Sequence, residues 1–198
     1  MYAACVNRLL LVRHGQTAWN AAGRLQGHTD IELDETGREQ ALALARTLGD
    51  AGITQVWSSD LLRARQTAAI IAEHLGIAAP STDAELRERR FGVFEGLTRD
   101  ECAVTHPAAW REWVAQTGHP PGGEPRSEAT ARMQRALARR VSANEAGEGT
   151  TLVVSHGGVM RLWLLELLGT AVPIVGNATT YVLDHDGTAF RATLREPS

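Results

Sequence analysis

The chain has 198 residues, of which 43% are hydrophobic and 22% are charged, and its formal net charge is −3. This composition is typical of one globular domain, and the lack of a basic excess argues against a general nucleic-acid binder. All 20 basic residues are arginine, whose guanidinium suits forked contacts with phosphate. Neither a membrane-spanning apolar run nor an export signal is visible, so we expect a cytoplasmic protein with Cys5 and Cys102 as free thiols.

The apolar pattern predicts short strands that alternate with helices along the sequence. Strands are expected at residues 9–12, 53–57 and 151–155, followed by a hairpin of strands 179–183 and 189–194. Helices are expected at residues 34–52, 61–75, 98–116 and 128–144. A last apolar helix is expected to follow residues 157–158 and to end at residue 168. Asp34 or Thr36 can cap the first helix, Gly76 ends the second, and residues 81–96 show no regular pattern.

This alternation indicates a three-layer α/β/α sandwich with a mainly parallel central sheet. Nothing reads as an interdomain linker, so we expect one domain over residues 1–198 with a helical covering segment around residues 97–127. In such folds a ligand binds beyond the carboxyl ends of the strands. Polar residues follow three of the predicted strands, namely Arg13–His14, Ser58–Ser59 and His156.

The first strand end carries the string R-H-G-Q-T at residues 13–17. A neutral imidazole at such a position can point into a cleft and attack phosphorus, so His14 is a candidate nucleophile. Gly15 lets the backbone approach an anion, while Thr17 and Asn20 add a hydroxyl and an amide in the same turn. A lone histidine here would more often serve only as a hydrogen-bond partner, but the full string is rare by chance.

The second strand end opens a helix, whose N-terminal amides favour an anion. Arg63 lies in the first turn of this helix and can reach a phosphate group. Arg65 lies about 200° further round the helix, so we expect it to be a surface charge.

Two later segments add proton transfer and charge. Glu88 and Glu95 lie close in sequence to three arginines, and either one is a candidate general acid and base. A salt-bridged loop is the structural alternative. His156 is followed by Gly157–Gly158, and this second imidazole would add positive charge to an anion site when protonated.

Five stretches resemble, in order, the histidine phosphatase superfamily, also called phosphoglycerate mutase-like. They are LVRHGQTAWN, GRLQGHTDIEL, SSDLLRARQTA, LRERRFGVFEG and VVSHGGVMR. The resemblance implies that His14 is the phosphorylated nucleophile and that Glu88 is the acid and then the base. It implies a phosphate pocket formed by Arg13, Arg63 and His156, with Asn20, Gln26 and Gly27 at its edge. Thr17, Glu88 and Gly157 are further candidates for substrate binding. Glu95 matches a structural turn of the family.

The resulting prediction is a phosphomonoester hydrolase that needs no metal and no cofactor and acts on a small-molecule phosphomonoester. The alternatives are a cofactor-dependent phosphoglycerate mutase-type isomerase and a phosphoprotein (phosphohistidine) phosphatase. Mutases that resemble this chain carry extra residues before the second histidine, so the short chain favours a phosphatase. Trp110 and Trp113 can form an apolar wall over an organic leaving group or can face the core. A homodimer is compatible with the sequence.

Overall fold

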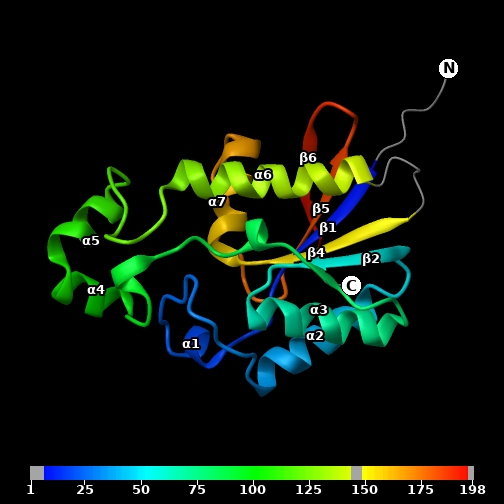
Figure 1. The fold of residues 1–198 in the computed structure, drawn as a ribbon, viewed down its shortest axis with the longest axis horizontal. Coiled ribbons are helices and arrows are strands. Elements are labelled where there is room, and N and C mark those ends of the chain that lie inside the picture. The colour runs from blue at the N-terminus through cyan, green and yellow to red at the C-terminus, as the bar shows by residue number, and fades with distance from the viewer. Residues whose placement is uncertain (1–6, 144–148, 196–198) are drawn as a thin grey trace.

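The computed structural model describes residues 7–143 and 149–195. A six-stranded sheet in the order β3-β2-β4-β1-β5-β6 lies between two layers of helices (Figure 1). The strands are β1 (Asn7–Arg13), β2 (Ile53–Ser58), β3 (Ser81–Thr82), β4 (Thr150–Ser155), β5 (Thr180–His185) and β6 (Phe190–Leu194). The helices are α1 (Ala18–Ala21), α2 (Glu35–Thr47), α3 (Leu62–Leu75), α4 (Arg99–Thr105), α5 (Pro107–Val114), α6 (Arg126–Ala143) and α7 (Gly157–Leu168), with 3₁₀ turns η1 (Ala84–Leu86) and η2 (Gly92–Phe94).

The sheet is mainly parallel, as the sequence predicts. β4 pairs in parallel with both β1 and β2, and β2 pairs in parallel with β3. β5 runs antiparallel to both of its neighbours, and with β6 it forms the predicted C-terminal hairpin. The three central strands β1, β2 and β4 therefore end at the same edge of the sheet.

Alternate residues of β1 fill the two sides of the core, because successive side chains of a strand point to opposite faces. Leu9 and Leu11 pack with apolar residues of α6 and α7, while Leu10 and Val12 pack with those of α2 and α3. All four leucine and valine side chains are almost completely buried. Figure 1 shows the two helical layers on either side of the sheet.

Most element boundaries lie within a few residues of the prediction, and the differences have local causes. Asp34, and not Thr36, caps α2, because its side chain accepts a hydrogen bond from the Gly37 amide at 2.8 Å. The helix expected at 98–116 is split in two, since Pro107 begins a new helix at its first position. Residues 81–96, for which no pattern was predicted, contain the short edge strand β3 and both 3₁₀ turns.

α4 and α5 lie at one end of the sandwich, away from the sheet (Figure 1). They are joined to the body by a small aromatic core, in which Phe94 is fully buried and contacts Trp110 and Trp113 edge-on at ring-centroid distances of 5.7 Å. Cys102 of α4 is buried in the same cluster as a free thiol, while Cys5 lies outside the described residues. Phe94 thus anchors α4 and α5 to the body of the protein.

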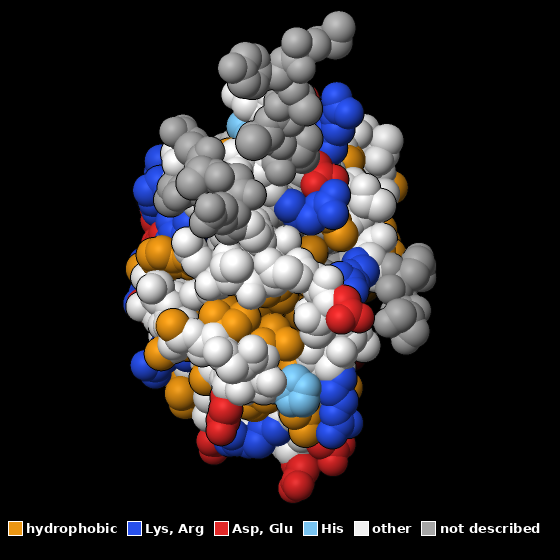
Figure 2. All heavy atoms as spheres, turned by 90° about the vertical axis from the view of Figure 1, so that its right-hand side faces the viewer, with side chains coloured by type: hydrophobic (Ala, Val, Ile, Leu, Met, Phe, Trp, Pro, Cys, Tyr) orange, Lys and Arg blue, Asp and Glu red, His pale blue; other side chains and the backbone are white. Residues whose placement is uncertain are grey.

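The opposite end of the molecule is shown in Figure 2. A small apolar area near the centre of that face is bordered mainly by backbone and uncharged side chains, with acidic, arginine and histidine side chains further out. Across the described part of the chain, no helix is both long and apolar enough to cross a bilayer.

The loop after β1 lies directly against the first turn of α2. A Cβ atom on Gly15 would come within 2.4 Å of the Gly37 carbonyl oxygen, and one on Gly37 within 2.1 Å of the Gln16 carbonyl oxygen. The Gly15 amide also donates to the Thr67 hydroxyl of α3 at 3.0 Å. The backbone that follows His14 is therefore fixed by two helices.

We expect Gly37→Ala to destabilise the protein, because its methyl group meets backbone atoms that cannot move away. Overpacking of this kind costs about 1–3 kcal/mol of unfolding free energy. Urea unfolding of the variant measures the loss, with Gly49→Ala as the matched control, since a Cβ there meets only one carbonyl oxygen at 3.6 Å. Equal unfolding midpoints for the two variants would contradict the close packing described above.

Candidate active site

A cavity of about 430 Å³ lies beyond the carboxyl ends of β1, β2 and β4. It is walled on the other side by α5 and by the residues that precede α6. Seven of the expected catalytic and substrate-binding residues line it, namely Arg13, His14, Asn20, Gln26, Arg63, Glu88 and Gly157. The parallel sheet thus brings together motifs that lie up to 144 positions apart in the sequence.

His14 presents one ring nitrogen with a free lone pair. Its Nδ1 atom lies 2.6 Å from the Gly15 carbonyl oxygen, and because a carbonyl can only accept, Nδ1 carries the proton. The Nε2 atom of a neutral ring is then unprotonated. Burial lowers the pKa of His14 well below its ordinary value, and the charges of Arg63 and Arg13 lower it further. The geometry and the charges both favour a neutral imidazole with a nucleophilic Nε2.

His156 lies behind His14, with 5.0 Å between the ring centroids, and does not itself line the cavity. Arg63 donates from Nε to the His156 Nδ1 atom at 3.2 Å, so the proton of the neutral ring is on Nε2. Burial, followed by the charge of Arg63, lowers the pKa of His156 well below 6.5. The lowered pKa favours the neutral form of His156 in the protein without ligand, so the positive charge that a protonated ring would add is not favoured there. The ring offers a neutral N–H donor in its place.

Arg63 is completely buried, although it carries a guanidinium. Its Nη1 and Nη2 atoms donate to the carbonyl oxygens of Thr29 and Gly27 at 2.9 and 2.8 Å. Burial lowers its pKa to about 10, which still leaves it charged at neutral pH. Arg65, two residues along, is exposed, as predicted.

Arg13 is held at the other side of His14. Its Nη1 atom donates to the Val175 carbonyl oxygen at 2.6 Å, while its buried Nε atom has no hydrogen-bond partner among the described residues. A Cβ atom on Gly157 would lie 2.9 Å from this Nε. The glycine after His156 is thus required by the close approach of the arginine.

Glu88 is bound to the N-terminus of α7. Its carboxylate accepts hydrogen bonds from the amides of Gly158, Val159 and Arg89 at 2.7–2.8 Å. A Cβ atom on Gly158 would come within 2.6 Å of the same carboxylate. Within the described residues, Glu88 is the one acidic side chain that lines the cavity.

Glu95 has a different position from Glu88. Its carboxylate accepts from the amides of His28, Thr29 and Phe91, and from the Thr29 hydroxyl. These contacts tie two loops together, and the side chain does not line the cavity. Of the two acids left open by residue type alone, only Glu88 lines the cavity.

Three other expected residues are placed as follows. Thr17 forms a reciprocal capping box with Asn20 at the start of α1, so its hydroxyl positions Asn20 and does not line the cavity. Gly27 lies at a positive φ of 54°, and its carbonyl binds Arg63 from outside the cavity. Gln26 lines the cavity, and its buried Oε1 atom has no partner within the part of the chain that is described.

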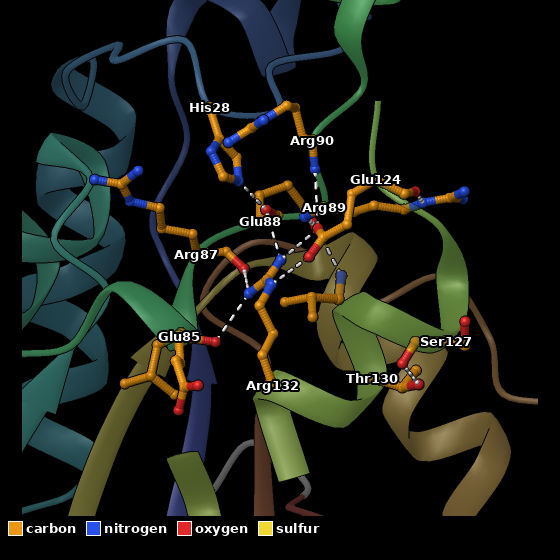
Figure 3. Close-up of polar contacts among 12 residues, drawn as sticks. His28, Glu85, Arg87, Glu88, Arg89, Arg90, Glu124, Ser127, Thr130 and Arg132 are labelled. Atoms are coloured by element: carbon orange, nitrogen blue, oxygen red, sulfur yellow. Dashed lines mark hydrogen bonds and ion pairs between the residues drawn. The ribbon is translucent and has the colours of Figure 1, made fainter. Parts of the chain in front are cut away.

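The loop that carries Glu88 is fixed by Arg132 of α6, as Figure 3 shows. All five of its guanidinium protons are used. Nη1 donates to the carbonyl oxygens of Glu85 and Arg87, and Nη2 donates to that of Glu88. The Glu124 carboxylate accepts from Nε at 2.6 Å and from Nη2 at 2.8 Å. His28 donates to the Glu88 carbonyl oxygen at 2.8 Å. Sequence reasoning missed this network, although the arginine-rich pattern of α6 was visible.

The cavity also contains residues that sequence analysis did not assign. They are the five arginines Arg24, Arg89, Arg99, Arg126 and Arg161. Trp113, which was expected either in an apolar wall or facing the core, also lines the cavity, next to Val114. Trp110 packs only on the aromatic core, so of the two tryptophans Trp113 alone takes part in both. Over the residues that the structure describes, no group of three or more His, Cys, Asp or Glu side chains is arranged to hold a metal ion.

We expect the free energy of unfolding to fall as the pH drops from 6.5 to 5.5 in a buffer without phosphate. The unfolded chain binds a proton at each histidine near pH 6.5, whereas buried His14 and His156 have lowered pKa values and stay neutral. Each contributes a loss of up to about 1.4 kcal/mol at pH 5.5. Urea unfolding should show a shallower pH dependence in His156→Gln, and identical slopes would show that His156 titrates normally.

A sequence profile of the histidine phosphatase superfamily (branch 1) matches residues 9–196. The chain is 40% identical to a phosphoglycerate mutase-like protein 4 of Arabidopsis thaliana, over 77% of this chain and 67% of that protein. It is 37% identical to a metal-independent phosphoserine phosphatase of the same organism, over 82% and 69%. A mycobacterial glucosyl-3-phosphoglycerate phosphatase, solved with VO3, superposes with a TM-score of 0.81 at 34% identity, over 95% of this chain and 97% of that one. This protein belongs to the histidine phosphatase superfamily.

Proposed function

We propose that the protein is a metal-independent phosphomonoester hydrolase that works through a phosphohistidine on His14. The family, and the relatives named as phosphatases, support hydrolysis of phosphate monoesters. The observation that carries the mechanism is the hydrogen bond of 2.6 Å between His14 Nδ1 and the Gly15 carbonyl oxygen. It orients a neutral ring whose free Nε2 is the nucleophile.

In the first step the Nε2 lone pair of His14 attacks phosphorus, and the bond between phosphorus and the ester oxygen breaks. Arg13 and Arg63 supply charged donors to the phosphoryl oxygens, and His156 supplies its neutral Nε2–H. These groups are held by backbone carbonyls and by each other before substrate binds. Preorganised donors of this kind stabilise the transition state without further rearrangement.

Glu88 acts as the general acid in the first step and as the general base in the second. It gives a proton to the leaving oxygen in the first step, and in the second it takes a proton from the water that attacks phosphohistidine. The phosphorus–nitrogen bond then breaks, phosphate leaves, and His14 returns to its neutral form. The position of Glu88 supports this role, since it is the one carboxylate lining the described cavity and α7 fixes its orientation.

An isomerase would form the same phosphohistidine and return the phosphoryl group to its substrate. Several relatives have phosphoglycerate mutase or mutase-like names, which supports this second function as the alternative. We favour hydrolysis because the solved phosphatase is 34% identical to this chain, whereas a solved phosphoglycerate mutase that covers as much of the chain is 24% identical. We also propose that the chain works as one domain, in which the segment around residues 97–127 covers the cavity.

We expect the purified protein to hydrolyse p-nitrophenyl phosphate in excess EDTA, and His14→Ala to remove this activity. Loss of the nucleophile removes the covalent path, so kcat should fall at least about 10³-fold. Phosphate release in the two proteins is the measurement, and Arg65→Ala serves as the surface control. Activity that needs added metal, or that survives in His14→Ala, would contradict the mechanism. Isomerisation of 3-phosphoglycerate faster than phosphate release would replace hydrolysis by mutase chemistry.

We expect Glu88→Gln to slow substrates with poor leaving groups far more than p-nitrophenyl phosphate. An alkoxide needs a proton as it leaves, whereas p-nitrophenolate does not, and general acid catalysis contributes about 10²–10⁴-fold. Comparison of kcat for p-nitrophenyl phosphate and for an alkyl phosphate gives the leaving-group effect. Equal slowing of both substrates would remove Glu88 as the acid.

A further inference from the structure

The loop that presents the Glu88 carboxylate has no regular secondary structure. Glu88 and Arg89 follow the turn η1, and neither forms a backbone-to-backbone hydrogen bond within the described chain. The Arg89 amide and the Glu88 carbonyl oxygen bond to side chains instead, and the Glu88 carboxylate accepts from the amides of Gly158 and Val159. The position of this carboxylate therefore depends on the side chains that hold the main chain of the loop.

Arg132 of α6 holds this main chain at three points, as Figure 3 shows. Its Nη1 atom donates to the carbonyl oxygens of Glu85 and Arg87 at 2.8 and 2.6 Å, and its Nη2 atom donates to that of Glu88 at 2.9 Å. His28 binds only the last of these three oxygens. A planar guanidinium with five fixed N–H groups can bind three carbonyls and a carboxylate together, whereas an ammonium has only three N–H groups on one atom.

Glu124 fixes the guanidinium of Arg132 in turn. Its two carboxylate oxygens accept from Nε and Nη2, and both side chains are only 10% exposed. Burial alone would raise the pKa of Glu124, but the hydrogen bonds and the charge of Arg132 lower it below its usual value. The Glu124 amide also donates to the Arg90 carbonyl oxygen at 2.9 Å. The end of the covering segment, the first turns of α6 and the acid loop are thus held as one unit.

The stability of the fold does not by itself account for this buried ion pair. Desolvation of two charges costs about as much as their attraction returns, and well-packed apolar residues are often as stable in their place. A general acid, in contrast, has to lie within about 2.6–3.2 Å of the atom that it protonates. A misplacement of about 1 Å can cost about 10²-fold in rate, so the position of Glu88 is a quantity that such a pair can protect.

We propose that Arg132 is a positioning residue for proton transfer, which keeps the Glu88 carboxylate at the N-terminus of α7 and within reach of the leaving oxygen. This inference rests on the proposed function, because it requires Glu88 as the general acid. Arg132 does not line the cavity, so it acts through Glu88 and not on the substrate. Loss of Arg132 should therefore resemble a partial loss of the acid.

The leaving-group ratio, which is kcat for p-nitrophenyl phosphate divided by kcat for glycerol 3-phosphate, measures proton delivery to the leaving oxygen. We expect Arg132→Met to raise this ratio at least tenfold. Arg135→Met is the matched control, because Arg135 lies three residues along α6 and binds only the exposed side of Glu85, and its ratio should stay within twofold. A smaller folded fraction lowers both rates equally and leaves the ratio unchanged. A ratio within twofold of the wild-type value in Arg132→Met would overturn the inference.

Two further variants separate positioning from loss of the fold. Arg132→Met leaves the Glu124 carboxylate buried without its partner, so Arg132→Met combined with Glu124→Gln removes both charges and should show the same tenfold rise. Added to Glu88→Gln, Arg132→Met should change the ratio less than twofold, because the acid to be positioned is already absent. A further tenfold rise in that background would show that Arg132 acts apart from Glu88, and would contradict the inference.

Hydrogen exchange of the peptide 156–160, followed by mass spectrometry, reports the same contact without turnover. The amides of Gly158 and Val159 donate to the Glu88 carboxylate, so we expect them to exchange faster in Arg132→Met than in the wild type, and at wild-type rates in Arg135→Met. Faster exchange in a protein that hydrolyses no phosphomonoester would reject the proposed function and retain the positioning role. Hydrolysis together with wild-type exchange in Arg132→Met would retain the proposed function and overturn the positioning role.

Discussion

The parallel register of β1 with β4 determines the chemistry of the site. Arg13 lies opposite Ser155, and each strand is followed by a histidine, so that the His14 amide donates to the Ser155 carbonyl oxygen and the two rings lie 5.0 Å apart. A slip of one residue would turn every β1 side chain to the other face and separate the rings. The apolar alternation of β1, with Leu9 and Leu11 on one side and Leu10 and Val12 on the other, prevents this slip.

Burial of positive charge is the second constraint. Arg63 is completely inside the protein and is held by two carbonyl oxygens and by His156, with no carboxylate in contact with it in the described chain. Burial, and then the charge of Arg63, lowers the pKa of both histidines, and neutral rings fit the proposed roles of a nucleophile and an N–H donor. An anion that enters the cavity relieves the same repulsion, so ligand binding should stabilise the fold as well as start the reaction. Glu88 is held in place without a ligand, because the amides of α7 bind its carboxylate and Arg132 binds its carbonyl oxygen.

Much of this arrangement could be predicted from the sequence. Strand ends are marked by a change from apolar to polar residues, so the positions of His14, Arg63 and His156 followed from the α/β pattern. The protonation state of His156 could not be predicted, because it depends on the contact with Arg63, 93 positions away. Arg89 and Arg132 were missed for a similar reason. Nothing local separates an arginine that enters a cavity from one that forms a surface ion pair, and only the packing of α6 against the acid loop shows the difference.

The central claim is that His14 itself carries the phosphoryl group. Rapid mixing with radiolabelled substrate, followed by quenching in alkali and peptide mapping, tests it directly. A phosphorus–nitrogen bond to histidine is cleaved by acid and survives alkali, so we expect an alkali-stable, acid-labile label on the peptide that contains residues 13–17. The label should be absent from His14→Ala and should accumulate within the first turnover. A label on another residue, or turnover without any covalent label in the pre-steady state, would contradict the mechanism.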